Sequence, residues 1–96
     1  MKYTVKFTSK FKKDYKLAKK RGYDIGKLEI VINLIADGTK QQQLIYEYND
    51  HALSGNWKGY RECHIAPDWL IIYELLDDIL VLSLSRTGTH SDLFNE

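Results

Sequence analysis

Residues 60–85 read YRECHIAPDWLIIYELLDDILVLSLS, and this stretch decides the fold. It contains three apolar segments, rich in the β-branched and aromatic residues that favour strands. The segments are residues 60–66, 69–75 and 79–85. Two short turn sequences, Pro67-Asp68 and Asp77-Asp78, separate them. Strands joined by such short turns run antiparallel, so we predict a three-stranded meander.

The N-terminal part of the chain predicts one strand followed by two helices. Residues 2–7 (KYTVKF) alternate apolar and polar side chains, as a half-buried strand does. A first amphipathic helix follows a capping residue, Thr8 or Ser9. A second helix lies between Asp24, which can cap its start, and Gly38, which follows its end.

The predicted architecture is α+β, with the element order β-α-α-β-β-β. Residues 39–59 are polar and contain glycine, with a short strand or an irregular extension at residues 44–48. The tail, residues 86–96, is predicted to be a loop. We expect an antiparallel sheet with the two N-terminal helices packed on one face, which leaves the other face to carry a site. Residues 1–96 are expected to form a single domain.

Composition limits the classes of protein to which this chain can belong. Hydrophobic residues make up 44% of the chain and charged residues 28%, as in an ordinary globular domain. No apolar stretch is long enough to span a bilayer, and the N-terminus lacks the apolar segment of a secretory signal. Cys63 is the only cysteine, which excludes an internal disulfide framework and suits a cytoplasmic protein. It neighbours His64 on a strand, so their side chains point to opposite faces, and we expect a buried, inert thiol.

The net charge of +1 conceals an uneven distribution. Residues 1–27 carry ten Lys or Arg against two Asp, a balance of +8, whereas residues 28–96 carry four Lys or Arg against eleven Asp or Glu, a balance of −7. The basic part either attracts a polyanion such as RNA or is simply the solvated face of a helix. The lysines concerned are Lys12, Lys13, Lys16, Lys19 and Lys20.

The candidate catalytic residues lie in the second half of the chain. His51, His64 and His90 are its only histidines, and Asp68 and Arg86 lie near strand ends. Together they suit metal-independent RNA cleavage, which needs a base, an acid and a cation to stabilise the phosphorane. The alternatives are structural or surface histidines, or a zinc site, although the HxH and HxxxH spacings of zinc ligands are absent.

Three further residues are candidates for substrate contact. Trp69 or Phe94 can stack on a base, and Arg61 lies near a strand end, where it can contact substrate. A tryptophan beside a hairpin turn is also a common core residue, so both interpretations of Trp69 stay open.

A longer motif contains all of these positions. Residues 50–73 read DHALSGNWKGYRECHIAPDWLIIY, and residues 86–94 read RTGTHSDLF. Both stretches closely resemble the YafQ-type branch of the RelE superfamily, toxins of type II toxin–antitoxin systems. The element order resembles that family over the whole chain. The resemblance implies a compact fold similar to microbial ribonucleases.

The resemblance also implies an activity and partners. Such toxins are endoribonucleases that cleave mRNA in the ribosomal A site, stop translation, and need neither a metal nor another cofactor. A cognate antitoxin, often with a ribbon-helix-helix part, holds them inactive, and operator DNA is contacted only through it. No membrane is involved. Toxins of the same fold that poison gyrase by binding, and decayed toxins kept as co-repressors, are the alternatives. The histidines and Asp68 favour the enzyme, because a binding inhibitor has no need of them.

The resemblance assigns roles by position. We hypothesise that His51 or His64 helps activate the 2′-hydroxyl, that Asp68 orients or assists, and that His90 protonates the leaving oxygen. Arg86 matches the arginine expected to stabilise the transition state. Two aromatic residues match positions that shape the site and contact substrate, namely Trp69 and Phe94.

Overall fold

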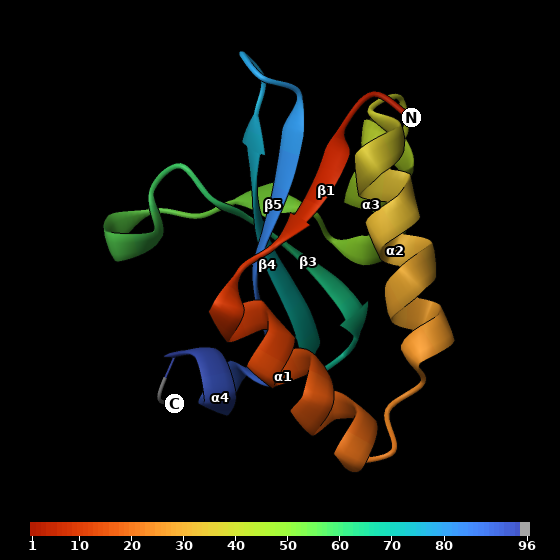
Figure 1. Cartoon of the computed structure of the whole chain (residues 1–96), viewed down its shortest axis with the longest axis vertical. Coiled ribbons are helices and arrows are strands. Elements are labelled where there is room, and N and C mark those ends of the chain that lie inside the picture. Colours follow the sequence, from red (N-terminus) through yellow and green to blue (C-terminus); the bar gives the residue numbers. More distant parts are fainter. Residues whose placement is uncertain (95–96) are drawn as a thin grey trace.

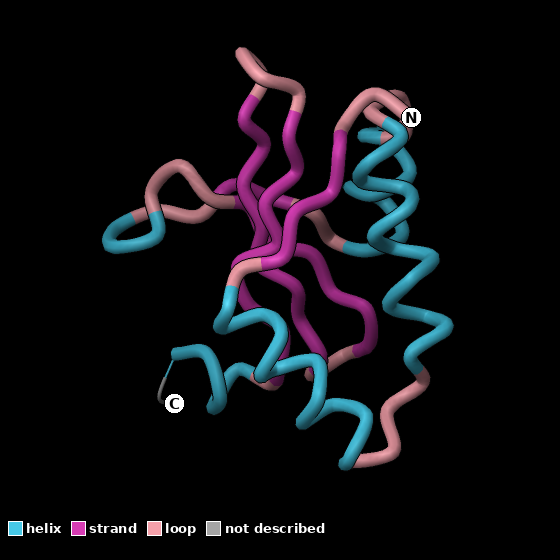
Figure 2. The backbone as a smooth tube through the Cα atoms, viewed as in Figure 1, coloured by secondary structure: helices cyan, strands magenta, loops and turns pink. Residues whose placement is uncertain are grey.

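The computed structural model describes residues 1–94. Its helices are α1 (Ser9–Lys20), α2 (Ile25–Asp37), α3 (Gln41–Tyr48) and α4 (His90–Phe94), with a 3₁₀ turn, η1 (Gly55–Trp57). Its strands are β1 (Thr4–Phe7), β2 (His51–Ala52), β3 (Arg61–Ala66), β4 (Trp69–Leu76) and β5 (Val81–Gly88) (Figure 1). Figure 2 shows the strands at the centre, α2 and α3 along one side, and the η1 loop projecting from the other. The predicted α+β class is confirmed.

The strands form one sheet in the order β1-β5-β4-β3-β2. The meander of β3, β4 and β5 is antiparallel, as predicted. The prediction of a wholly antiparallel sheet is wrong, because β1 pairs with β5 in parallel, with Thr4 opposite Val81. A tight turn forces its two strands to run antiparallel, but no turn joins β1 to β5. The direction of β1 is therefore set by the path of the helices and not by a local signal.

Both predicted N-terminal helices are present with the predicted ends. The hydroxyl of Thr8 accepts a hydrogen bond from the backbone N–H of Phe11 and so caps α1. Asp24 precedes α2 in extended conformation, but its side chain makes no capping hydrogen bond, and Gly38 ends α2 in the left-handed conformation, with φ of +81°.

The segment predicted as a short strand or irregular extension is instead the helix α3. Leu44 is buried on its inner side, while Tyr48, one turn later, packs against the same core. Asn49 ends the helix in a left-handed conformation, with φ of 51°. Glutamine is a good helix former, so the polar start of this segment supports a helix, and the short apolar run concealed its periodicity.

The C-terminal tail is more ordered than the predicted loop. Strand β5 continues to Gly88, and α4 follows immediately. Thr89 and Asp92 cap this helix reciprocally: the N–H of Thr89 donates to the Asp92 carboxylate, and the N–H of Asp92 donates to the Thr89 hydroxyl. This capping box is a local signal in the sequence that the prediction did not use. It fixes the backbone on which His90 stands.

The two faces of the sheet carry separate apolar clusters. Helices α1, α2 and α3 cover one face, where they pack on side chains such as Cys63, Ile71 and Leu84. The opposite face, here called the site face, carries Leu70 and Ile72, which pack against α4 and the η1 loop. The site face is thus only partly covered.

No helix within residues 1–94 is long and apolar enough to cross a membrane.

Candidate active site

Strand β3 turns alternate side chains to the two faces of the sheet. Cys63 and Ile65 lie in the core under the helices, whereas Glu62 and His64 belong to the site face. Burial raises the pKa of the Cys63 thiol well above its ordinary value, so the sulfur stays protonated and unreactive. The sequence prediction did not include Glu62, although its spacing of two residues from His64 could have revealed it.

Glu62 lies between two histidines and accepts contacts from both. One carboxylate oxygen, Oε1, lies 3.2 Å from Nε2 of His64 and 3.5 Å from Nε2 of His51. His51 stands directly opposite Glu62 in the pairing of β2 with β3. Glu62 is only 5% exposed, so water screens its charge poorly. A nearly buried carboxylate held by two imidazoles can take up a proton and pass it on.

The geometry constrains the protons of His51. Its Nδ1 lies 2.7 Å from the backbone carbonyl oxygen of Asn49. A carbonyl oxygen only accepts, so Nδ1 must carry a hydrogen. In the neutral ring Nε2 is then an acceptor facing the Glu62 carboxylate, and a favourable contact needs a proton between the two groups. His51 and Glu62 therefore form a pair that is suited to share one proton.

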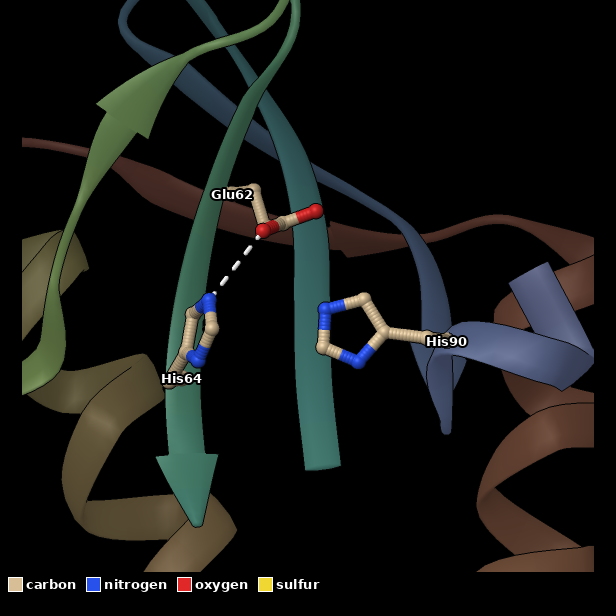
Figure 3. A group of neighbouring side chains, drawn as sticks. All are labelled: Glu62, His64 and His90. Atoms are coloured by element: carbon tan, nitrogen blue, oxygen red, sulfur yellow. Dashed lines mark hydrogen bonds and ion pairs between the residues drawn. The ribbon is translucent and has the colours of Figure 1, made fainter. Parts of the chain in front are cut away.

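His90 reaches the same cluster from α4. Its backbone nitrogen and its ring Nδ1 both lie within hydrogen-bonding distance of Oδ1 of Asp68, at 3.0 and 2.8 Å. The backbone N–H and then the ring of His90 lower the pKa of Asp68, so this group is a carboxylate at neutral pH. As an acceptor, it favours the tautomer with hydrogen on Nδ1. The His90 and His64 ring centroids lie 5.7 Å apart in an edge-to-face arrangement, and Figure 3 shows both rings beside Glu62.

The cluster offers a donor set that fits a metal ion. One ligand atom from each of Glu62, His64 and His90 lies within 4.8 Å of the others. Two imidazoles and a carboxylate form a common set for zinc or copper. The absence of HxH and HxxxH spacing argued against such a site, but His64 and His90 come from different elements, which sequence spacing does not detect.

The structure separates the remaining predicted substrate residues. Trp69 is 5% exposed, donates to the Thr87 hydroxyl and packs on Tyr23 under the helices, so it lies in the core and not at the predicted substrate contact. Arg61 shares the helix-covered face with Cys63 and is also turned away from the histidines. Phe94 does reach the site, since its ring centroid lies 6.4 Å from that of His90.

Arg86 is engaged by an acidic partner. Its Nε and Nη2 lie 2.6 and 3.2 Å from the two carboxylate oxygens of Asp14 on α1, and the same carboxylate accepts the N–H of Thr87. This bidentate pair fixes the arginine and compensates part of its charge. A phosphate would have to compete with Asp14 for the guanidinium.

A buried ionic network supports the strand that carries His51. Asp50 is 6% exposed and accepts hydrogen bonds from Arg61, at 2.8 and 2.6 Å, and from the hydroxyl of Tyr73. Burial and the neighbouring Asp50 raise the pKa of Tyr73, which keeps its hydroxyl protonated as a donor. Because Asp50 immediately precedes His51, this network fixes the start of β2.

The predicted RNA-binding lysines all lie exposed on α1. Helix α1 is also tied to α4, because Arg21 donates to Asp92 at 2.7 Å. This pairing and the Thr89 N–H lower the pKa of Asp92. The lysine-bearing helix is thereby attached to the helix that presents His90. The five residues are Lys12, Lys13, Lys16, Lys19 and Lys20.

A family model described as "Bacterial toxin of type II toxin-antitoxin system, YafQ" matches residues 3–95. The sequence is 42% identical over 90 residues to the mRNA interferase toxin YafQ of Escherichia coli strain K12, covering 94% of each chain.

Solved structures agree with this match. The E. coli DinJ–YafQ toxin–antitoxin complex contains a chain that superposes with a TM-score of 0.86 at 41% identity, covering 98% of this chain and 99% of that one. A metal-bound toxin from Helicobacter pylori superposes with a TM-score of 0.87 at 38% identity, covering 96% of this chain and 99% of that one.

Proposed function

Because the chain belongs to the YafQ family of bacterial type II toxin–antitoxin toxins, we propose that it is a single-domain, ribosome-dependent mRNA interferase acting in the cytoplasm. The observation that carries the proposal is the convergence of three histidines and Glu62 on the partly covered site face. The substrate is mRNA in the ribosomal A site, and its cleavage stops translation. These groups supply the acid and base that RNA cleavage needs, without a bound cofactor.

We assign the base to the Glu62 side of the cluster. Glu62, with His51 or His64 as a relay, takes the proton of the 2′-hydroxyl, and the resulting alkoxide attacks the neighbouring phosphorus. His90, as an imidazolium, gives its Nε2 proton to the 5′-oxygen as the P–O bond breaks, and Asp68 holds the ring through the proton that stays on Nδ1. The products are a 2′,3′-cyclic phosphate, which water can open to a 3′-phosphate, and a 5′-hydroxyl end.

Arg86 is the proposed electrostatic stabiliser of the phosphorane. In the described structure its guanidinium forms an ion pair with the Asp14 carboxylate. The role therefore requires a substrate phosphate to draw part of the guanidinium away from that carboxylate. Phe94, which contacts His90, is proposed to position the substrate.

The proposed regulator is a cognate antitoxin. The DinJ–YafQ complex of E. coli shows a relative of the same fold with its antitoxin. By the same arrangement, this chain would bind an antitoxin, of the ribbon-helix-helix type, and reach operator DNA only through it. This proposal includes no membrane partner.

The reaction can be tested with purified components. The toxin is incubated with an mRNA either free or bound in the A site of programmed ribosomes, and the ends of the fragments are analysed. We expect cleavage on the ribosome, with a 5′-hydroxyl on one fragment and a cyclic or 3′-phosphate on the other. Fragments with a 3′-hydroxyl and a 5′-phosphate would contradict the mechanism, and equal cutting of free mRNA would contradict ribosome dependence.

Metal ions are expected to inhibit cleavage. A bound ion needs the lone pairs of His64 and His90 that proton transfer also needs. Activity should therefore persist after EDTA treatment, with Mg²⁺ restored only to the level that ribosomes require, and should fall when Zn²⁺ or Cu²⁺ is added. Strict dependence of the cleavage rate on added Zn²⁺ would contradict the metal-free mechanism.

The α1 lysines are expected to attract ribosomal RNA. Replacing Lys12, Lys13, Lys16, Lys19 and Lys20 with Gln should weaken ribosome binding and flatten its dependence on salt, by about 0.7–0.9 in log–log slope for each phosphate that the variant no longer neutralises. The measurement is ribosome co-sedimentation over a series of KCl concentrations. An unchanged slope would show that these side chains only solvate the helix.

A further inference from the structure

A row of aromatic rings leads away from His90 on the site face. The centroids of Phe94 and His90 are 6.4 Å apart, those of Trp57 and Phe94 6.3 Å, and those of Tyr60 and Trp57 5.3 Å. Each step lies within the range of aromatic contact. Both contacts of Trp57 are edge-to-face, at 81° and 87°, so neither is a stacked pair. The row links the catalytic cluster to the η1 loop.

The row ends in an open groove between the start of α1 and the η1 loop. Trp57 and Tyr60 line one part of this groove, and Lys10 and Arg86 provide its positive charge. Its other lining side chains are hydroxyl or amide groups, and no acidic side chain of residues 1–94 lines it. In Figure 1 the η1 loop projects from the sheet on the side where α1 begins and α4 lies.

We propose that this groove binds a nucleotide of single-stranded RNA beside the scissile phosphate, with its base stacked on Trp57 and its phosphate on Lys10. Aromatic faces and cations together are how proteins hold single strands without reading sequence. Continuity with His90 through Phe94 favours RNA over an unrelated ligand, because one strand can follow the row from the cleavage site. The inference rests on the proposed function, since it extends the substrate of the same site.

The test measures binding apart from cleavage. A labelled 2′-O-methyl oligoribonucleotide lacks the 2′-hydroxyl nucleophile, so it can bind but not be cut. Its dissociation constant should rise about 5- to 150-fold for Trp57→Ala and recover largely for Trp57→Phe. Lys10→Gln should reduce the log–log salt slope by about 0.7, the value for one single-strand phosphate contact. Fluorescence anisotropy gives both quantities.

Two matched controls isolate the groove. Tyr46→Ala removes an 82% exposed ring from α3, and Lys58→Gln removes an exposed lysine next to Trp57 that does not line the groove. Neither should change binding. The inference is overturned if Trp57→Ala binds as the wild type does, or if the wild type shows no binding up to about 1 mM in low salt, above the usual range of non-specific affinity.

The outcome separates this inference from the proposed function. If the wild type cuts mRNA on ribosomes while Trp57→Ala leaves oligonucleotide binding unchanged, only the groove inference fails. If the wild type cuts no mRNA while Trp57→Ala still weakens binding, the groove is an RNA site and the proposed catalysis fails.

Discussion

His90→Ala slows mRNA cleavage on programmed ribosomes by about 10²–10⁴-fold and abolishes growth arrest on induction, if His90 is the general acid. In the proposed mechanism the imidazole protonates the leaving 5′-oxygen, and Asp68 holds His90 in place through one hydrogen bond from its ring and one from its backbone N–H. Alanine keeps the backbone N–H that donates to Asp68, so the start of α4 should be preserved. The rate under single-turnover conditions is the measurement.

Two controls accompany this variant. Antitoxin binding and thermal unfolding should match the wild type, because the His90 ring is partly exposed and its loss removes little buried surface. Tyr46→Ala, which removes an exposed ring from α3, should cleave at the wild-type rate. Full toxicity of His90→Ala would remove this histidine from the mechanism.

The second large effect concerns stability. Asp50→Ala should lower the free energy of unfolding by about 2–4 kcal/mol, since it leaves the hydroxyl of the buried Tyr73 and the charge of Arg61 without their shared acceptor. The lower end of this range applies if water solvates Arg61 after Asp50 is removed, since the Arg61 side chain is 36% exposed. Urea unfolding followed by tryptophan fluorescence measures the change.

Asp78→Ala is the matched control, because it removes an exposed carboxylate from the turn between β4 and β5. Its effect should stay within about 0.5 kcal/mol. Equal stability of the Asp50 and Asp78 variants would show that the network does not anchor β2. Cleavage by Asp50→Ala, measured well below its unfolding temperature, should also fall, because His51 loses its fixed position.

Local sequence signals predicted much of the fold. The meander, both N-terminal helices and the Thr8 cap followed from alternation, helical spacing and turn residues, which act over a few neighbouring positions. The parallel pairing of β1 with β5 was missed, because it joins segments more than 70 residues apart with no turn between them. Helix α3 was missed because Leu44 is its one buried residue, which leaves little periodicity to detect.

The site was predictable in residue type and less so in geometry. The motif drew attention to the three histidines and Asp68, and folding brings them close to one another. Alternation on β3 already implied that Glu62 accompanies His64, but buried acidic residues are uncommon and the position was overlooked. Trp69 was included as a substrate contact although it lies in the core. The face that a strand residue occupies depends on the register of the whole sheet, which the sequence does not reveal directly.

We propose that the histidine cluster cuts translated mRNA. Primer extension mapping of transcript 5′ ends after induction tests this most directly, with the wild type and His90→Ala compared on the same messages. We expect new ends, in frame and only within translated regions, for the wild type and none for the variant. The same ends with both proteins, or new ends on untranslated transcripts, would contradict it.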